Sequence, residues 1–306
     1  MSPISVHPDG NDSLTVVSTG GRRLAEYRWE ASNNHPYFCH VRPTAHDGVL
    51  TTHAPYDHRW HHGIWWAWKF INDVNFWEDH PGFGGTRNGL GRSRVVSHSI
   101  RKNPATSSVS IVQTLEWTPD ASAEPFLSES RLITLTESDA AWSMDWSLRF
   151  RANRDLTFST TKYPDFAWGG YAGLNYRPAR SMRDNELIAI DGDRRGLESV
   201  HGKPTRWSLY AGLVDGSGAD DPEHPARGSV VIFSHRSNEW PATAYAASAQ
   251  NQFGFLASAP LFWKERVLEQ GSVVRLDYRM RIGDSVPEAT VLDAEADEFE
   301  KSVAIS

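Results

Sequence analysis

The sequence predicts a mostly β protein, built as a large antiparallel β-sandwich with a short C-terminal helix. Three observations lead to this fold class: several segments alternate strictly between apolar and polar residues, turn-forming residues separate them, and convincing helical periodicity occurs once. Strict alternation buries one face of each strand, which is typical of antiparallel sheets. With 306 residues and 39% hydrophobic positions, the chain can bury a large core, and we expect one domain over residues 1–306.

Strands are expected along most of the chain. The clearest alternation covers residues 142–151, where Trp142 and Trp146 share one face. Residues 274–282 repeat this pattern, and residues 109–117 fit it with one slip. Shorter strand candidates are residues 14–18, 24–29, 37–41, 132–136, 207–214, 230–234 and 253–257.

One helix longer than two or three turns is expected, near residues 293–304, because four apolar residues recur there at steps of four, three and four. They are Leu292, Ala296, Phe299 and Val303. Pro287 suits the start of this helix. No fixed-period repeat indicates a propeller. Residues 216–227, rich in Gly, Asp and Pro, are interpreted as a surface loop and not as a domain boundary.

Composition excludes several classes of partner. A net charge of -7 provides no basic field for a phosphate backbone, so we expect no nucleic acid. No run approaches the roughly 20 apolar residues of a membrane helix and residues 1–10 contain no signal core, so we expect no membrane association and a cytoplasmic protein. The single cysteine, Cys39, excludes an intrachain disulfide and is interpreted as a small buried apolar residue. Homo-oligomer formation stays open.

Histidine and tryptophan are concentrated in one segment. Eight of the 13 histidines lie between His35 and His80, and five of the 13 tryptophans lie between Trp60 and Trp77. Imidazoles transfer protons near neutral pH, carboxylates orient them, and flat aromatic rings cover the apolar faces of sugar rings. The segment therefore predicts a site for a small polar ligand, best described as a sugar. The predicted catalytic residues are His61, His58, Asp57 and Glu78.

Roles within this segment follow from strand geometry. Neighbouring residues on a strand face opposite ways, so Asp57 is expected to orient His61 as the proton carrier, unless a tight turn intervenes, while His58 contacts substrate or metal. Trp65 and Trp77 are expected to form a stacking wall for the ligand. Further predicted substrate-binding residues in the segment are His62, Arg59 and Asn75.

Two other interpretations of this segment stay open. Any single histidine can instead hydrogen-bond to a loop backbone, and one face of residues 65–68 can be core. A divalent metal is the second alternative, since His58, His61 and His62 can be combined with Asp57 or Glu78, although their spacing matches no specific metal motif. We expect that no cofactor is required. Phosphate loops, serine-hydrolase elbows and dinucleotide fingerprints are absent from the sequence.

The segment resembles the bacterial PmoA-like family, whose members carry a stretch like Asp-His-Pro-His-His-Arg-Gly-Leu-Trp followed by an Asn-Gly-Val-Asp-Phe-Trp element. The matching residues are Asp57, His58, His61, Gly63, Trp65, Asn72, Val74, Phe76 and Trp77, whereas Arg59, Trp60 and His62 depart from the pattern. A second match comprises His235, Ser237, Asn238 and Pro241, and a third lies at residues 259–262. The order of these matches implies that the resemblance covers nearly the whole chain.

The resemblance implies a supersandwich like that of galactose mutarotase, and a setting among sugar-catabolic genes. We also expect His235, Asn238 and Glu239 to complete the site from another strand, because a sandwich brings distant edges together. The polar groups of both motifs, together with the resemblance, predict that His235 or Asn238 shares one cleft with His58, His61 and Trp65. Membrane methane monooxygenase subunits are integral membrane proteins, and this sequence has no spanning segment, so that activity is not expected.

The leading hypothesis is an enzyme of sugar catabolism that cleaves or isomerises a glycoside or an oxidised keto-sugar by acid/base chemistry. A glycoside hydrolase or lyase is favoured over an epimerase or isomerase. A non-catalytic sugar-binding or sensing protein is the second hypothesis, since the aromatic residues suffice for binding. An accessory subunit of a sugar oxidoreductase is the third.

Overall fold

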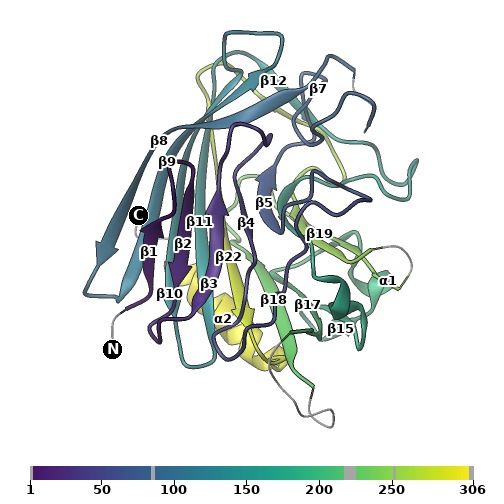
Figure 1. The fold of residues 1–306 in the computed structure, drawn as a ribbon. Helices are drawn as coiled ribbons and strands as arrows, with labels where there is room; N and C mark the ends of the chain where they lie inside the picture. The colour runs from purple at the N-terminus through teal and green to yellow at the C-terminus, as the bar shows by residue number, and fades with distance from the viewer. Residues whose placement is uncertain (1–2, 84–86, 217–224, 251–252, 303–306) are drawn as a thin grey trace.

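The computed structural model describes residues 3–83, 87–216, 225–250 and 253–302, and its strands form three sheets with antiparallel neighbours (Figure 1). The first sheet contains, in spatial order, β1 (Ser5–Pro8), β2 (Ser13–Val17), β3 (Arg23–Arg28), β4 (Tyr37–Cys39), β5 (Ile64–Ala67), β13 (Gly173–Tyr176), β20 (Phe255–Ala259), β19 (Thr243–Ala247) and β16 (Lys203–Pro204). The second contains β15 (Arg194–Arg195), β14 (Leu187–Ile190), β17 (Trp207–Leu213), β18 (Arg227–Ser234), β22 (Val273–Gly283), β11 (Ala141–Ala152), β10 (Leu127–Glu137), β9 (Ser108–Pro119) and β8 (Gly91–Asn103). A small third sheet contains β21 (Arg266–Leu268), β12 (Leu156–Ser159), β6 (Phe70–Ile71) and β7 (Val74–Asn75).

The first and second sheets pack face to face around a large apolar core. Trp66 of β5 lies with its ring centroid 5.6 Å from that of Phe150 on β11 and 5.5 Å from that of Tyr278 on β22. The residues predicted to share a face of β11, including Trp142 and Trp146, are buried here. The predicted antiparallel, mostly β sandwich is therefore confirmed.

The long strand β8 is not evident from the sequence. It is an edge strand whose second half is largely exposed, so its Arg, Ser and His residues produce no apolar period. Burial on one face generates the alternation that reveals a strand, and this part of β8 is not buried on either face.

The predicted C-terminal helix is confirmed as α2 (Ala289–Ser302), which begins four residues before the expected start. Its buried residues Leu292, Ala296 and Phe299 pack against the outer face of the second sheet, on Trp207 and Phe233 among others. Val303 lies outside the described residues, as do residues 217–224 of the predicted loop. The other described helices are single turns, the 3₁₀ helix η1 (Arg180–Arg183) and α1 (Leu197–Val200). None of the helices described is long and apolar enough to span a membrane.

The first sheet buries both of its faces, and this positions the site. On β5, Ile64 and Trp66 point into the sandwich, whereas Trp65 and Ala67 point to the outer face. A second apolar cluster covers that outer face, and Cys39 is buried within it, as predicted. The sheet therefore presents an aromatic platform on the side away from the second sheet.

Candidate functional site

A cavity of about 770 Å³ lies over the outer face of the first sheet. Its aromatic lining residues are Trp60, Trp77, Tyr163, Trp168, Tyr171, Tyr245, Phe253 and Phe255. Its polar lining residues are His58, His61, Glu78, Glu198, His201 and Ser248. The cavity thus contains three of the four predicted catalytic residues, with one predicted binding residue, Trp77.

Two tight turns shape the loop that carries the histidines. The backbone N–H of His58 donates to the carbonyl of Pro55 (3.1 Å), and the N–H of His61 donates to the carbonyl of His58 (2.9 Å). Gly63 then enters β5 with φ of +94°, where a Cβ atom would lie 2.4 Å from the carbonyl oxygen of Phe38. These turns direct both imidazoles into the cavity.

Asp57 and His58 form a hydrogen-bonded pair at the cavity wall, with 3.1 Å between Oδ2 and the imidazole Nδ1. Burial alone would raise the pKa of Asp57, but the charge of Arg177 and the hydrogen bonds from Arg177 and His58 hold this pKa at about 2. Burial lowers the pKa of His58, although Asp57 opposes that effect. His58 is therefore a neutral imidazole that presents its other nitrogen, Nε2, for a ligand.

The carboxylate of Asp57 should make the protein sensitive to acid. The folded-state pKa lies below the ordinary value near 4, so the stabilising effect is present above about pH 4 and is lost as the pH falls toward about 2. Asp57→Asn should therefore lose less unfolding free energy than wild type does over this pH window, as measured by denaturant titrations. Asp139→Asn, in an exposed turn, is the matched control. Equal acid sensitivity of Asp57→Asn and wild type would contradict the assignment.

His61 is buried at the base of the cavity, among aromatic rings. Its ring centroid lies 5.0 Å from that of Trp65 and 5.3 Å from that of Phe255. Arg177 approaches its Nδ1 with 3.4 Å to Nη1. Burial, followed by the charge of Arg177, lowers the pKa of His61 well below its ordinary value. Contrary to the strand-based expectation, Asp57 pairs with His58 and not with His61, because a tight turn replaces the expected strand.

Glu78 belongs to a buried polar group at another wall. Lys69 donates to its Oε2 and the Tyr171 hydroxyl donates to its Oε1 at 3.3 Å. Asn75 is a positioning residue here, since its Oδ1 accepts from the backbone N–H groups of Trp77 (2.9 Å) and Glu78 (3.3 Å). The structure therefore assigns Asn75 a backbone-fixing role and not the predicted substrate contact.

Three other predicted binding residues lie outside this cavity. Trp65 is fully buried, and its ring packs against the ring of His61. His62 and Arg59 line a separate polar depression of about 340 Å³, where the Nδ1 atoms of His62 and His53 are 3.3 Å apart. The loop thus sends His58 and His61 to one side and Arg59 and His62 to the other.

The predicted meeting of the two motifs in one cleft is wrong. His235 lies beside α2, where its Nε2 is 3.1 Å from the carbonyl oxygen of Glu300 and its ring packs against Phe299. Asn238 exchanges hydrogen bonds with the backbone of Asp277 on β22, and Glu239 accepts from the backbone N–H of Arg275. These polar groups fix the end of the second sheet, while the cavity lies on the outer face of the first.

Replacing Asn238 should therefore affect stability and not sugar binding. Asn238→Ala leaves the buried N–H group of Asp277 without its partner, while the Asp277 carbonyl keeps only the backbone N–H of His235, so the unfolding free energy should fall by about 1–3 kcal/mol. Denaturant unfolding measures this change, and calorimetric titration with a sugar that binds wild type provides the comparison. If a folded Asn238→Ala protein no longer binds sugar, the motif that contains His235 and Asn238 does contribute to the sugar site.

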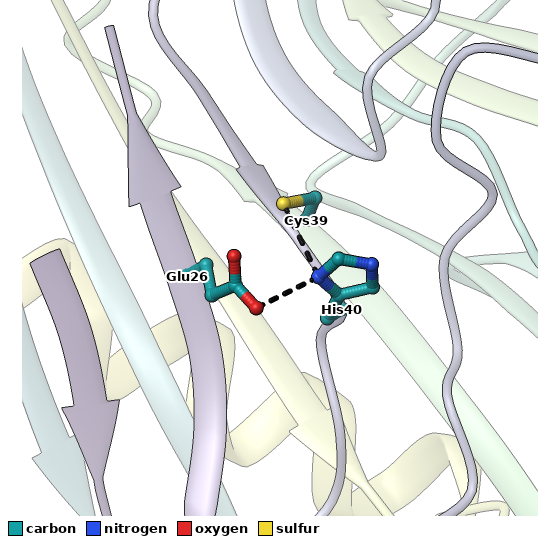
Figure 2. Close-up of side chains that lie close together, drawn as sticks. All are labelled: Glu26, Cys39 and His40. Carbon is teal, nitrogen blue, oxygen red and sulfur yellow. Dashed lines mark hydrogen bonds and ion pairs between the residues drawn. The ribbon is translucent and has the colours of Figure 1, made fainter. Parts of the chain in front are cut away.

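Another group of possible metal ligands lies on β3 and β4, at Glu26, Cys39 and His40 (Figure 2). The Nδ1 of His40 lies 2.9 Å from Glu26 Oε1 and 3.6 Å from Cys39 Sγ. However, Arg23 and Arg28 already form ion pairs with Glu26, and burial raises the pKa of the Cys39 thiol to about 12. This donor set fits an arginine–carboxylate cluster better than a metal site.

The residues predicted as possible metal ligands do not all line the same hollow. His62 belongs to the neighbouring depression, and the guanidinium of Arg177 lies within hydrogen-bond distance of both Asp57 and His61. A cation that joined Asp57 to His61 would meet this fixed positive charge. The geometry therefore favours an anion-stabilising arginine at this position.

Several residues of the site are not identifiable from the sequence. Arg177 follows β13, Tyr171 precedes it, Tyr245 lies on β19, and His201 follows α1. Each lies more than 90 positions from His61 and occurs without a local cluster of similar residues. The pairing of β13 with β5 and β20, and of β20 with β19, brings Arg177, Tyr171 and Tyr245 together. His201 joins them through its hydrogen bond with the backbone of Ala246 on β19.

Comparison with known proteins gives one family match. A model described as a family of unknown function, DUF6807, matches residues 14–297. No curated protein matches the chain. The family match does not test the PmoA-like resemblance, which stays an expectation.

Solved structures with similar folds include sugar enzymes. The GH36 alpha-galactosidase AgaB from Geobacillus stearothermophilus is 10% identical, with 92% of this chain and 41% of that chain covered and a TM-score of 0.48. The galactose mutarotase related enzyme from Lactobacillus acidophilus is 9% identical, with 93% and 99% covered and a TM-score of 0.36. The chain thus spans about two fifths of the alpha-galactosidase. At these scores, the likeness assigns no reaction to the chain.

Proposed function

We propose that this chain, which belongs to DUF6807, a family of unknown function, binds a sugar in its large cavity. In this proposal, His58 transfers a proton to or from the bound sugar. The observation that carries this proposal is the Asp57–His58 pair at the wall of an aromatic cavity. An imidazole oriented through one nitrogen by a carboxylate is a recurrent arrangement for proton transfer from the other nitrogen.

The cavity suits a sugar in size and lining. Its volume of about 770 Å³ is large enough for a monosaccharide ring with a substituent. Trp168, which is half-exposed, provides a flat surface for the apolar face of the ring, and the buried Trp77 and Tyr245 complete the aromatic wall around it. Glu198, Ser248 and other polar lining groups provide hydrogen-bond partners for hydroxyl groups.

Glu78 is the second candidate for acid/base chemistry. It lines the same cavity as His58, and its negative charge acts on that imidazole. Tyr171 and Lys69 hold the carboxylate in one orientation. Two titratable groups around one ligand allow proton removal at one atom and proton delivery at another, as cleavage or isomerisation of a sugar requires.

The test is a screen of purified protein against glycosides and their 3-keto derivatives, with and without a chelator, followed by product analysis. We expect turnover of at least one sugar by wild type and by His7→Gln, a control imidazole that is exposed on β1. We expect turnover by His58→Gln to be lower by at least about 100-fold. A chelator-sensitive reaction would add a metal to the site. Absence of both turnover and binding for every sugar would refute the proposal.

A non-catalytic sugar-binding role is the second candidate. The observation that favours it is that both carboxylates are already paired, Glu78 with Lys69 and Asp57 with Arg177. Paired carboxylates suit a fixed polar wall as well as a catalytic one. Calorimetric titration of the same panel separates the two roles: tight binding of one sugar without any turnover would support the binding protein.

A further inference from the structure

We propose that His58 and His61 are held in opposite tautomers and act together on a sugar that carries a carbonyl group. This inference rests on the proposed function and names its substrate class. It follows from the hydrogen-bond partners of the two imidazoles, which are of opposite kind. Arg177 is the positioning residue in this arrangement.

The partner of His58 determines where its proton lies. Asp57 is ionised at neutral pH because Arg177 and Arg180 both pair with it, and an ionised carboxylate can only accept a hydrogen bond. The 3.1 Å contact with Oδ2 therefore requires the proton on Nδ1 of His58. The lone pair is left on Nε2, which has no hydrogen-bond partner among the described residues, and the ring lines the cavity.

The partner of His61 imposes the opposite assignment. A guanidinium can only donate, so Nδ1 of His61 accepts from Nη1 of Arg177 across 3.4 Å. The proton of the neutral ring then lies on Nε2. Arg177 is itself fixed, because its Nη2 lies 2.6 Å from Asp57 Oδ2 and its guanidinium lies 4.0 Å from the ring centroid of Phe253.

The two rings lie side by side. His58 and His61 stack with 4.7 Å between centroids and 25° between planes, and both line the cavity. A lone pair on one ring and an N–H group on the other are therefore presented to the same ligand. Such a pair fits a molecule that has an acidic C–H bond next to a carbonyl group, because the carbonyl oxygen gains negative charge when the proton leaves.

The properties of His61 favour a carbonyl oxygen over a leaving-group oxygen. Burial among aromatic rings and the adjacent Arg177 keep the pKa of His61 low, so the ring stays neutral. A neutral imidazole is a good hydrogen-bond donor but a very weak acid. Protonation of a glycosidic oxygen needs a full proton, whereas an oxygen that becomes an enolate needs only a strong hydrogen bond.

The step balances with groups present in the site. Nε2 of His58 takes the proton from the carbon next to the carbonyl, so a C–H bond breaks and an N–H bond forms. The C–H electron pair becomes the C=C bond, and the carbonyl π pair moves to the oxygen, which accepts from Nε2–H of His61. Return of the proton to the same or the neighbouring carbon completes an epimerisation or isomerisation without any oxidant.

The tautomers can be measured without any substrate. Long-range ¹⁵N–¹H NMR spectra of wild type should show a protonated Nδ1 for His58 and a protonated Nε2 for His61. In Arg177→Met, His61 should lose its single tautomer while His58 keeps its own, and Arg177→Lys should restore part of the His61 signal. Identical tautomers on both rings of wild type would overturn the inference whatever the fold of the variants.

The substrate class is tested by hydrogen exchange in D₂O. We expect wild type to exchange the proton next to the carbonyl of D-fructose or methyl 3-oxo-glucoside, and not any carbon-bound proton of methyl glucoside. Arg177→Met should lower kcat for exchange by about 10- to 100-fold with a smaller change in KM. Turnover of methyl glucoside without exchange of either carbonyl probe would refute this inference and leave the proposed function standing. Failure to bind or turn over any of the three would count against both.

Discussion

Replacing His58 by Gln should lower sugar turnover by at least about 100-fold while sugar binding changes little, because a positioned acid or base contributes about this much. The amide of Gln can still form a hydrogen bond with Asp57, but it cannot accept a proton near neutral pH. The fold should survive, since the imidazole is half-buried at a cavity wall and is not part of the sandwich core. Steady-state kinetics and calorimetric titration on the same preparation measure the two effects.

Comparison variants separate catalysis from general damage. His7→Gln removes an exposed imidazole on β1 and should behave as wild type. Asp57→Asn should lower turnover less than His58→Gln, because it disturbs the orientation and tautomer of His58 without removing the ring. If His58→Gln keeps wild-type turnover, His58 is not the proton carrier and Glu78 becomes the leading candidate.

Sequence composition was sufficient to locate the cavity. The concentration of imidazoles and indoles in one segment predicts a polar, aromatic site, and His58, His61, Trp77 and Glu78 do line one cavity. The imidazoles carry most of this signal, since Trp65, Trp66 and Trp68 of the same segment are fully buried and do not line the cavity. The sandwich itself was predictable for a similar reason, since one-sided burial leaves a period of two in each strand.

Local geometry within that segment was not predictable. The expected pairing of Asp57 with His61 assumes a strand, whereas two turns place Asp57 against His58. The same turns send Arg59 and His62 into the neighbouring depression. A run of polar and aromatic residues carries no period from which such turns can be read.

Long-range placement failed for a different reason. His235 and Asn238 have polar side chains in a turn, as the first motif does, but they satisfy backbone groups of β22 and α2. Satisfying buried backbone groups and binding a ligand use the same residue types. Arg177 shows the converse case, since it lies 120 positions from Asp57 and joins the site only through strand pairing.

Replacing Lys69 by Met should lower the unfolding free energy by about 3–5 kcal/mol, because the variant leaves the carboxylate of Glu78 buried without its cation. The Lys69 and Glu78 side chains are 0% and 3% exposed, so little water can take the place of the lost partner. Burial lowers the pKa of Lys69, and the attraction of Glu78 opposes this effect, which is the behaviour of two charges that depend on each other.

A second substitution should reverse part of this loss. Lys69→Met combined with Glu78→Gln removes both charges and keeps a hydrogen-bond acceptor for Tyr171, so the double variant should be more stable than Lys69→Met alone. Arg195→Met is the matched control, since its ion pair with Asp193 is exposed on both sides and should be worth less than about 1 kcal/mol. Denaturant unfolding of the four proteins measures these differences. If Lys69→Met costs no more than Arg195→Met, the Lys69–Glu78 pair does not stabilise the wall of the cavity.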